Sequence, residues 1–169
     1  MSKSFTLIEL IVVIGIISVF TALVLPNYRL GDKTLALQRS SHKLARDLRG
    51  AQEMAMSVKE INGSTPYGFG VHFDSDSADS YILFADLNDN HHWDALDQDL
   101  ETVQIESGIE ISSLSPASEF SVLFSPPDPT VWINDSFSGV IAEITLALKT
   151  DSSVNKKVKV NNRGLIYIE

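Results

Sequence analysis

Residues 5–25 read FTLIELIVVIGIISVFTALVL. Four polar side chains interrupt this otherwise apolar run: Thr6, Glu9, Ser18 and Thr21. A helix of this length reaches roughly 30 Å, which is about the hydrocarbon thickness of a bilayer. A secretory signal peptide has a shorter apolar core that ends in a small-residue cleavage site, whereas this run ends at Pro26. The sequence therefore predicts a transmembrane helix over residues 5–28, preceded by a polar leader at residues 1–4.

One interpretation of this helix is an ordinary single-pass anchor, with Lys3 holding the N-terminus in the cytoplasm. Glu9 argues against that interpretation. A carboxylate inside an apolar helix costs roughly 2.5–3.5 kcal/mol on insertion scales and requires a partner. No Lys, Arg or His occurs in residues 5–27. The partner must therefore come from another chain, or from a free amino group near the start of the helix.

Residues 4–17, SFTLIELIVVIGII, resemble the class III signal of type IV pilins and type II secretion pseudopilins. The resemblance implies that a prepilin peptidase cuts between Ser4 and Phe5 and methylates the new amino terminus. It also implies that Glu9 pairs with the N-terminal amine of a neighbouring subunit, as the subunit-assembly residue. The family has glycine before the cut, where this chain has Ser4. Pro26 stands where the family's helix often carries a kinking proline, although a proline at the membrane exit fits equally well.

Beyond the apolar run, the chain shows two further periodicities. A short break at Leu30-Gly31-Asp32 precedes apolar residues at three- and four-residue spacing, which predicts an amphipathic helix within residues 29–60. From residue 61 onward the period changes to two, which is typical of strands. The strands that this pattern predicts are Tyr67–Phe73, Tyr81–Ala85, Thr102–Glu106, Ile109–Leu114, Phe120–Phe124, Val140–Leu148, Lys157–Val160 and Leu165–Ile168.

We therefore expect an α+β fold with a long N-terminal helix, transmembrane and then amphipathic, packed on a β-rich head over residues 61–169. The head is expected to be one antiparallel β-sheet, as in pilins. Within the family it most resembles the GspH/FimT type of minor pseudopilin, on the stretches ILFADLNDN at 82–90 and VKVNNRGLIYI at 158–168.

Charge is distributed unevenly along the chain. Residues 1–60 carry eight Lys/Arg and five Asp/Glu, residues 61–148 carry fifteen Asp/Glu and no Lys or Arg, and residues 149–169 carry five basic and two acidic residues. The acidic segment is either a solvated surface, or is neutralised by a metal or a basic neighbour. Nucleic acid is not expected to bind it, because phosphates require Lys and Arg. The candidate DNA contacts are Lys156, Lys157, Lys159 and Arg163.

An acidic loop offers a candidate metal site. Its members occupy positions 1, 3, 5, 9 and 12 of an EF-hand-like loop: Asp86, Asn88, Asn90, Asp94 and Asp97. Calcium binding is one interpretation and a solvated hairpin loop is the other. His91 replaces the glycine of the sharp turn, and Asp97 replaces the bidentate glutamate, which weakens the calcium interpretation. Zinc held by His91 and His92 is disfavoured, because adjacent histidines on a strand point in different directions.

Catalytic chemistry has little support in the sequence. The chain has no cysteine, which excludes disulfides, thiol catalysis and cysteine-based zinc sites. It contains neither a Gly-x-Ser-x-Gly elbow nor a phosphate-binding glycine loop. We therefore expect no enzymatic activity and no required cofactor, with Ca²⁺ as the only candidate.

The resemblance implies a function, a set of partners and a location. The expected function is that of a minor pseudopilin in a type II secretion pseudopilus, acting in filament assembly and protein secretion. A minor pilin of a type IV pilus, FimT-like and active in adhesion or DNA uptake, is the alternative. The implied partners are other pseudopilins or pilins through the N-terminal helix, the prepilin peptidase, the inner-membrane assembly platform and secreted substrates. The implied location is a single pass of the bacterial inner membrane, with the N-terminus cytoplasmic and the head periplasmic, and assembly into a filament.

Overall fold

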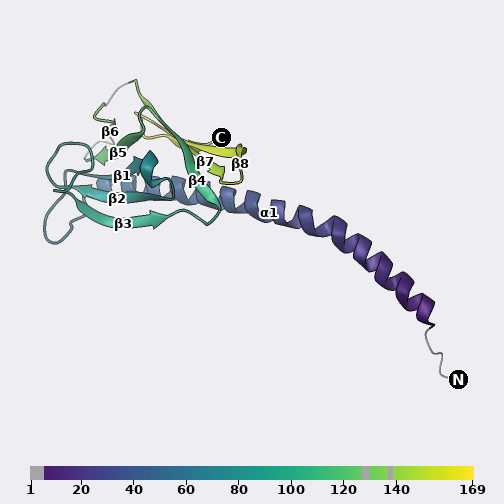
Figure 1. Cartoon of the computed structure of the whole chain (residues 1–169). Helices are drawn as coiled ribbons and strands as arrows, with labels where there is room; N and C mark the ends of the chain where they lie inside the picture. Colours follow the sequence, from purple (N-terminus) through teal and green to yellow (C-terminus); the bar gives the residue numbers. More distant parts are fainter. Residues whose placement is uncertain (1–5, 127–129, 137–138) are drawn as a thin grey trace. The chain divides into compact units, whose positions relative to one another are not determined.

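The computed structural model describes residues 6–126, 130–136 and 139–169, and for residues 24–30 it describes the helical backbone alone. One long helix, α1 (Leu7–Met56), precedes the strands in chain order (Figure 1). The expected break at Gly31 is absent, because α1 continues through it. The chain divides into two compact units, one ending at Leu35 and the other beginning at Ala36.

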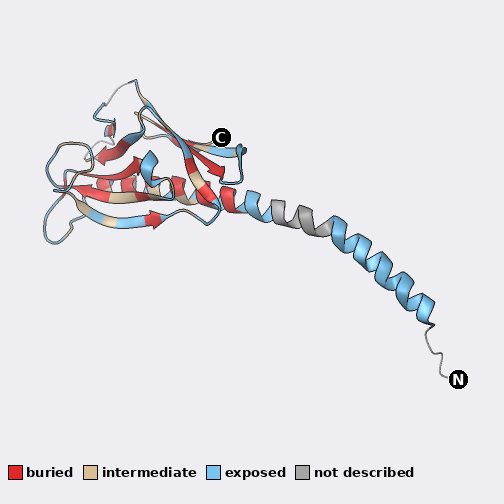
Figure 2. Cartoon of the chain, in the orientation of Figure 1, coloured by how far each residue is buried: buried red, intermediate tan, exposed pale blue. Residues whose placement is uncertain are grey.

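In the first unit, the described part of α1 exposes apolar side chains along its whole length (Figure 2). The exposed fraction of its large apolar residues between Leu7 and Leu23 ranges from 48% to 76%. The polar side chains here are satisfied within the helix: the hydroxyls of Ser18 and Thr21 each donate a 2.8 Å hydrogen bond to the carbonyl four residues earlier. The apolar surface of this segment therefore has no cover from its own unit.

The transmembrane assignment of residues 5–28 is corrected. Within the part of the chain that the structure describes, no helix combines the length and the apolar character needed to cross a membrane. The expected single pass of the bacterial inner membrane, with a cytoplasmic N-terminus and a periplasmic head, is corrected by the same finding.

The expected single β-sheet is also wrong, because the second unit contains two antiparallel sheets. The five-stranded sheet has the order β3-β2-β1-β5-β6, with these bounds: β1 (Gly68–Asp74), β2 (Ser80–Asp86), β3 (Gln98–Gln104), β5 (Glu119–Ser125) and β6 (Thr130–Ile133). The four-stranded sheet has the order β4-β7-β8-β9, with these bounds: β4 (Ile109–Ser115), β7 (Ile141–Leu148), β8 (Asp151–Asn161) and β9 (Ile166–Ile168). A 3-10 turn, η1 (Ser75–Ser77), joins β1 to β2.

The core lies between the two sheets and the second half of α1. Leu44 and Leu48 of the helix are fully buried, in one cluster with residues of both sheets such as Phe73 and Ile144. Burying a leucine side chain stabilises the fold by about 1.5–3 kcal/mol. A single sheet would cover only one side of this apolar stripe, which is the physical reason for two. The Tyr81 hydroxyl adds a 2.7 Å hydrogen bond to Asp47 on the helix.

The five-stranded sheet has a second buried face, opposite the core. Alternation along β1 turns Phe69, Val71 and Phe73 toward the core and Gly70 and His72 away from it. A β-carbon on Gly70 would lie 2.7 Å from the Phe84 ring and 2.8 Å from the Val122 carbonyl oxygen. Only glycine therefore leaves room for the Phe84 ring against β1 at this position. We call this second surface the outer face.

Candidate functional site

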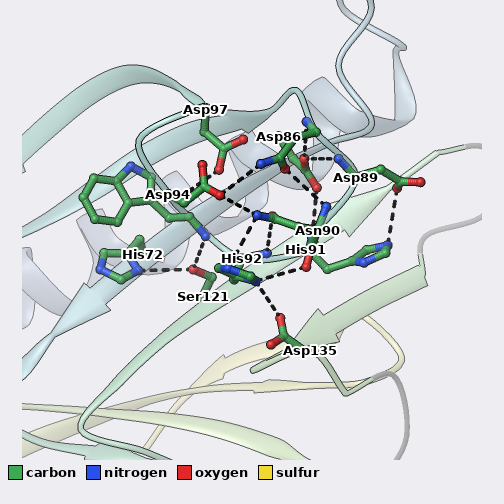
Figure 3. A network of polar contacts seen from close by, with 12 residues as sticks. His72, Asp86, Asp89, Asn90, His91, His92, Asp94, Asp97, Ser121 and Asp135 are labelled. Carbon is green, nitrogen blue, oxygen red and sulfur yellow. Dashed lines mark hydrogen bonds and ion pairs between the residues drawn. The ribbon is translucent and has the colours of Figure 1, made fainter.

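The loop between β2 and β3 folds back over the outer face (Figure 3). His91 stacks on Trp132 of β6, with ring centroids 3.9 Å apart, and Trp93 stacks on His72 of β1 at 4.6 Å. The Trp93 backbone N–H also donates to the Ser121 hydroxyl at 3.0 Å. These contacts attach the predicted acidic loop to three strands of the sheet.

Asp86 organises the start of this loop. Its side chain is fully buried and accepts backbone N–H groups from three loop residues: Asn88 at 3.0 Å, Asp89 at 2.7 Å and His91 at 3.2 Å. Such bonds hold the turn closed. Asp86 therefore closes the loop on itself.

Asp94 and Asp97 close the other end of the loop. Asp94 accepts the side-chain amides of Asn88 at 3.0 Å and Asn90 at 2.7 Å, and the Leu96 N–H lowers the pKa of its carboxyl group. Asp97 accepts the backbone N–H of Leu87 at 3.1 Å and of Asp94 at 3.0 Å. Burial raises the pKa of Asp97, so the two carboxyl groups are shifted in opposite directions.

The structure thus brings the five proposed calcium ligands into one loop, but their oxygens serve the loop itself. Within the described residues, no group of three or more His, Asp or Glu side chains is arranged to hold a metal ion. An ion would have to replace hydrogen bonds such as those that Asp86 and Asp94 already accept. Calcium binding by Asp86, Asn88, Asn90, Asp94 and Asp97 stays a prediction.

A second polar cluster beside this loop was not predicted. His72 is 5% exposed, and its Nδ1 lies 3.2 Å from the Ser121 hydroxyl. Its Nε2 lies 3.7 Å from Oε1 of Glu119. Nearby, Nδ1 of His92 lies 3.4 Å from Oδ1 of Asp135. The sequence signal that was available is the position of His72 on the polar side of β1.

The cluster lines a cavity of about 180 Å³ on the outer face. Eight residues from two strands and two loops form its walls: His72, His92, Trp93, Glu119, Phe120, Ser121, Asn134 and Asp135. Burial lowers the pKa of His72, against the opposing effect of Glu119, Asp74 and Asp99. The imidazole is therefore neutral at pH 7.

Ser121, His72 and Glu119 have the residue types of a nucleophile, a base and an acid. Ser121 is only 1% exposed, however, and its oxygen already accepts the Trp93 N–H. This arrangement fixes the loop to the sheet and leaves the hydroxyl poorly placed to attack a substrate. The chemical capacity of the cavity lies instead in its carboxylates and flat rings.

The N-terminal residues that the sequence singled out are described in part. Ser4 and Phe5 lie outside the described residues. Pro26 lies within α1, but its side chain is outside the described residues as well. Glu9 and Thr6 form a capping box: Thr6 Oγ1 accepts the Glu9 N–H at 3.3 Å, and Glu9 Oε2 accepts the Thr6 N–H at 3.2 Å. Within one chain, Glu9 thus caps its own helix.

The basic residues of the C-terminal strands are largely paired. Lys157 lies 2.6 Å from Glu143, and Lys159 lies 3.3 Å from Glu143 and 2.7 Å from Glu169. The hydrogen bond from Lys157 lowers the pKa of Glu143. Two of the four candidate DNA-binding cations are therefore engaged with carboxylates of the protein.

Comparisons with protein families, curated proteins and solved structures find no match to this chain.

Proposed function

We propose that this chain is a subunit of a type IV pilin-like filament and assembles through the first half of α1. Within this class we propose a minor pseudopilin of a type II secretion pseudopilus, acting in filament assembly and protein secretion. The supporting observation is the uncovered apolar surface between Leu7 and Leu23, which is 48–76% exposed at its large residues. A helix that is apolar on every side is stable only when it is buried. Helices of neighbouring subunits would supply that cover.

The N-terminal motif supports the same proposal. Residues 4–17 resemble the processing signal of this class, with Phe5 as the first residue after cleavage. Thr6 would then be the second residue of the processed chain, so the capping box would lie at its very start. A neighbour's amino terminus brought to Glu9 would neutralise its charge, and the cap orients the carboxylate for that contact.

DNA uptake on a type IV pilus has less support than secretion. Phosphate binding needs unpaired cations. Lys157 and Lys159 already neutralise Glu143 and Glu169, which leaves Lys156 and Arg163 as the other candidates. We therefore place protein secretion before DNA uptake.

Three substitutions separate the two roles of Glu9. Glu9→Gln keeps the capping box, because glutamine serves there as well as glutamate, but it removes the charge. Glu9→Leu removes both, and Thr6→Val removes the hydroxyl of the cap while keeping the charge. We expect Glu9→Gln and Glu9→Leu to be lost from the sheared filament fraction of the source organism, and Thr6→Val to be retained. The measurement is the ratio of tagged chain in that fraction to tagged chain in whole cells.

Retention of Glu9→Gln at the wild-type level would contradict the intersubunit pairing and leave Glu9 as a helix cap only. Equal loss of all three variants would show that filament entry needs the Thr6 hydroxyl as well as the Glu9 charge, and it would contradict the expected retention of Thr6→Val.

A further inference from the structure

We propose that the cavity on the outer face binds the guanidinium group of an arginine side chain from a partner protein. The cavity lies where the β2–β3 loop meets the sheet, beside His72 and Ser121 (Figure 3), and Trp93 also lines it. Glu119 and Asp135 stand on its walls. The inference depends on the second unit alone and is independent of filament assembly.

The size of the cavity favours one end of a side chain. Its volume of about 180 Å³ is below the roughly 300–1,000 Å³ of pockets that enclose whole small-molecule ligands. A side chain presented by a protein enters with its charged end, and the partner's backbone stays outside. The cavity therefore fits a protein partner better than a free metabolite.

The charge of the cavity favours a cationic ligand. The side chains of Glu119 and Asp135 are 64% and 59% exposed, so both carboxylates are accessible at the cavity. Each of these carboxylates faces a histidine, His72 or His92, rather than a Lys or Arg of the described residues. The stretch from residue 61 to residue 148 contains no Lys or Arg. An incoming cation would thus meet two carboxylates without displacing a permanent positive charge.

His72 adds a polar atom to the cavity wall. Its Nδ1 bonds to Ser121, whereas its Nε2 makes no hydrogen bond within the described residues and faces Glu119 across 3.7 Å. Ser121 Oγ already accepts the Trp93 N–H and can donate its own hydrogen to Nδ1, which leaves Nε2–H facing the Glu119 carboxylate. The other carboxylate oxygen of Glu119 can accept an N–H donor from a partner.

The flat walls favour arginine over lysine. Trp93 and His92 line the cavity, and a planar guanidinium can stack on an aromatic ring while its five N–H donors bind carboxylates. A lysine ammonium offers three donors and no plane to stack. The site should therefore discriminate between the two cations.

The chain has two tryptophans, which provide a direct test. Trp93 lines the cavity, and Trp132 packs on His91 outside it. The full-length chain, labelled with ¹⁵N at tryptophan, is titrated with N-acetyl-arginine methylamide while both indole N–H signals are followed by NMR. N-acetyl-lysine methylamide and the neutral isostere N-acetyl-citrulline methylamide are matched probes. We expect saturable movement of the Trp93 signal with arginine, weaker binding of lysine and no movement with citrulline.

Two variants locate the effect. Glu119→Gln should weaken arginine binding about tenfold, because it removes a charge-assisted hydrogen bond. Glu110→Gln, on β4 of the other sheet, changes the net charge equally and should leave binding unchanged. Equal shifts with citrulline, equal movement of both tryptophan signals, or wild-type binding by Glu119→Gln would each overturn the proposal.

Discussion

The two halves of α1 share one secondary structure and differ in almost everything else. In the second half, apolar residues such as Leu44 and Leu48 form a stripe that two sheets of the same chain bury completely. In the first half, apolar residues occupy every side and stay 48–76% exposed at their large members. The amphipathic half is covered by its own chain, whereas the described side chains of the apolar half have no such cover. In the proposed filament, hydrophobic periodicity would separate the part of a helix that folds the protein from the part that assembles it.

The largest expected effect comes from shortening one buried leucine in the second half of α1, compared with one exposed leucine in the first half. Leu48→Ala should lower the free energy of unfolding of the head by about 2–5 kcal/mol, because it leaves a cavity in a fully buried core. Leu10→Ala, at a side chain that is 58% exposed, should leave that free energy unchanged. Denaturant unfolding followed by tryptophan fluorescence measures both. A comparable loss for Leu10→Ala would show that the apolar half contributes to the stability of the head.

A smaller effect on stability is expected when a methyl group is added at Gly70, with Gly15 as the control. Gly70→Ala should destabilise the head by about 1–3 kcal/mol, because its β-carbon would press on Phe84 and on the Val122 carbonyl. Gly15→Ala, in the apolar half of α1, has nothing within 4 Å of the new carbon. It should leave head unfolding unaffected. Equal unfolding midpoints for the wild type and Gly70→Ala would contradict the close packing of the outer face.

The smallest expected effect is a pH dependence at His72. Burial lowers its pKa below the ordinary 6.5, although Glu119, Asp74 and Asp99 raise it and His92 lowers it further. In the unfolded chain the His72 imidazole takes up a proton near pH 6.5, whereas in the folded chain it does so only at lower pH. The free energy of unfolding therefore falls as the pH drops below 6.5. His72→Gln should flatten the stability curve between pH 7 and pH 5. His42→Gln, at an exposed position of α1, is the control and should keep the wild-type slope.

Local pattern predicted most elements of the head, since the expected strands such as 109–114 and 120–124 overlap β4 and β5. The strand β6 was missed, because it is short and follows a proline-rich stretch. The division into two sheets was also missed. It depends on pairings such as β1 with β5 and β4 with β7, which join segments far apart in the sequence. Periodicity reports which way a side chain faces but not which strand lies beside it.

The same contrast applies to the two candidate sites, because one was visible in the sequence and the other was not. The acidic loop was visible as a run of Asp and Asn, and the structure assigns its oxygens to backbone N–H groups of the loop. The cavity was not visible, because His72 and Ser121 lie 49 residues apart and meet only across paired strands. Sequence spacing can suggest ligands within one loop. It cannot reveal a site that the fold assembles from several elements.

The most direct test of the account places a photo-crosslinking amino acid in each half of α1. Benzoyl-phenylalanine at Ile14, which is 54% exposed in the single chain, should capture another filament subunit in cells of the source organism, with the adduct identified by mass spectrometry. The same group at Arg46, an exposed position in the amphipathic half, is the matched control and should give far less of that adduct. A subunit adduct at Ile14 that disappears with Glu9→Gln is the predicted result. An Ile14 variant that forms no adduct with any filament subunit would contradict assembly through the apolar half of α1.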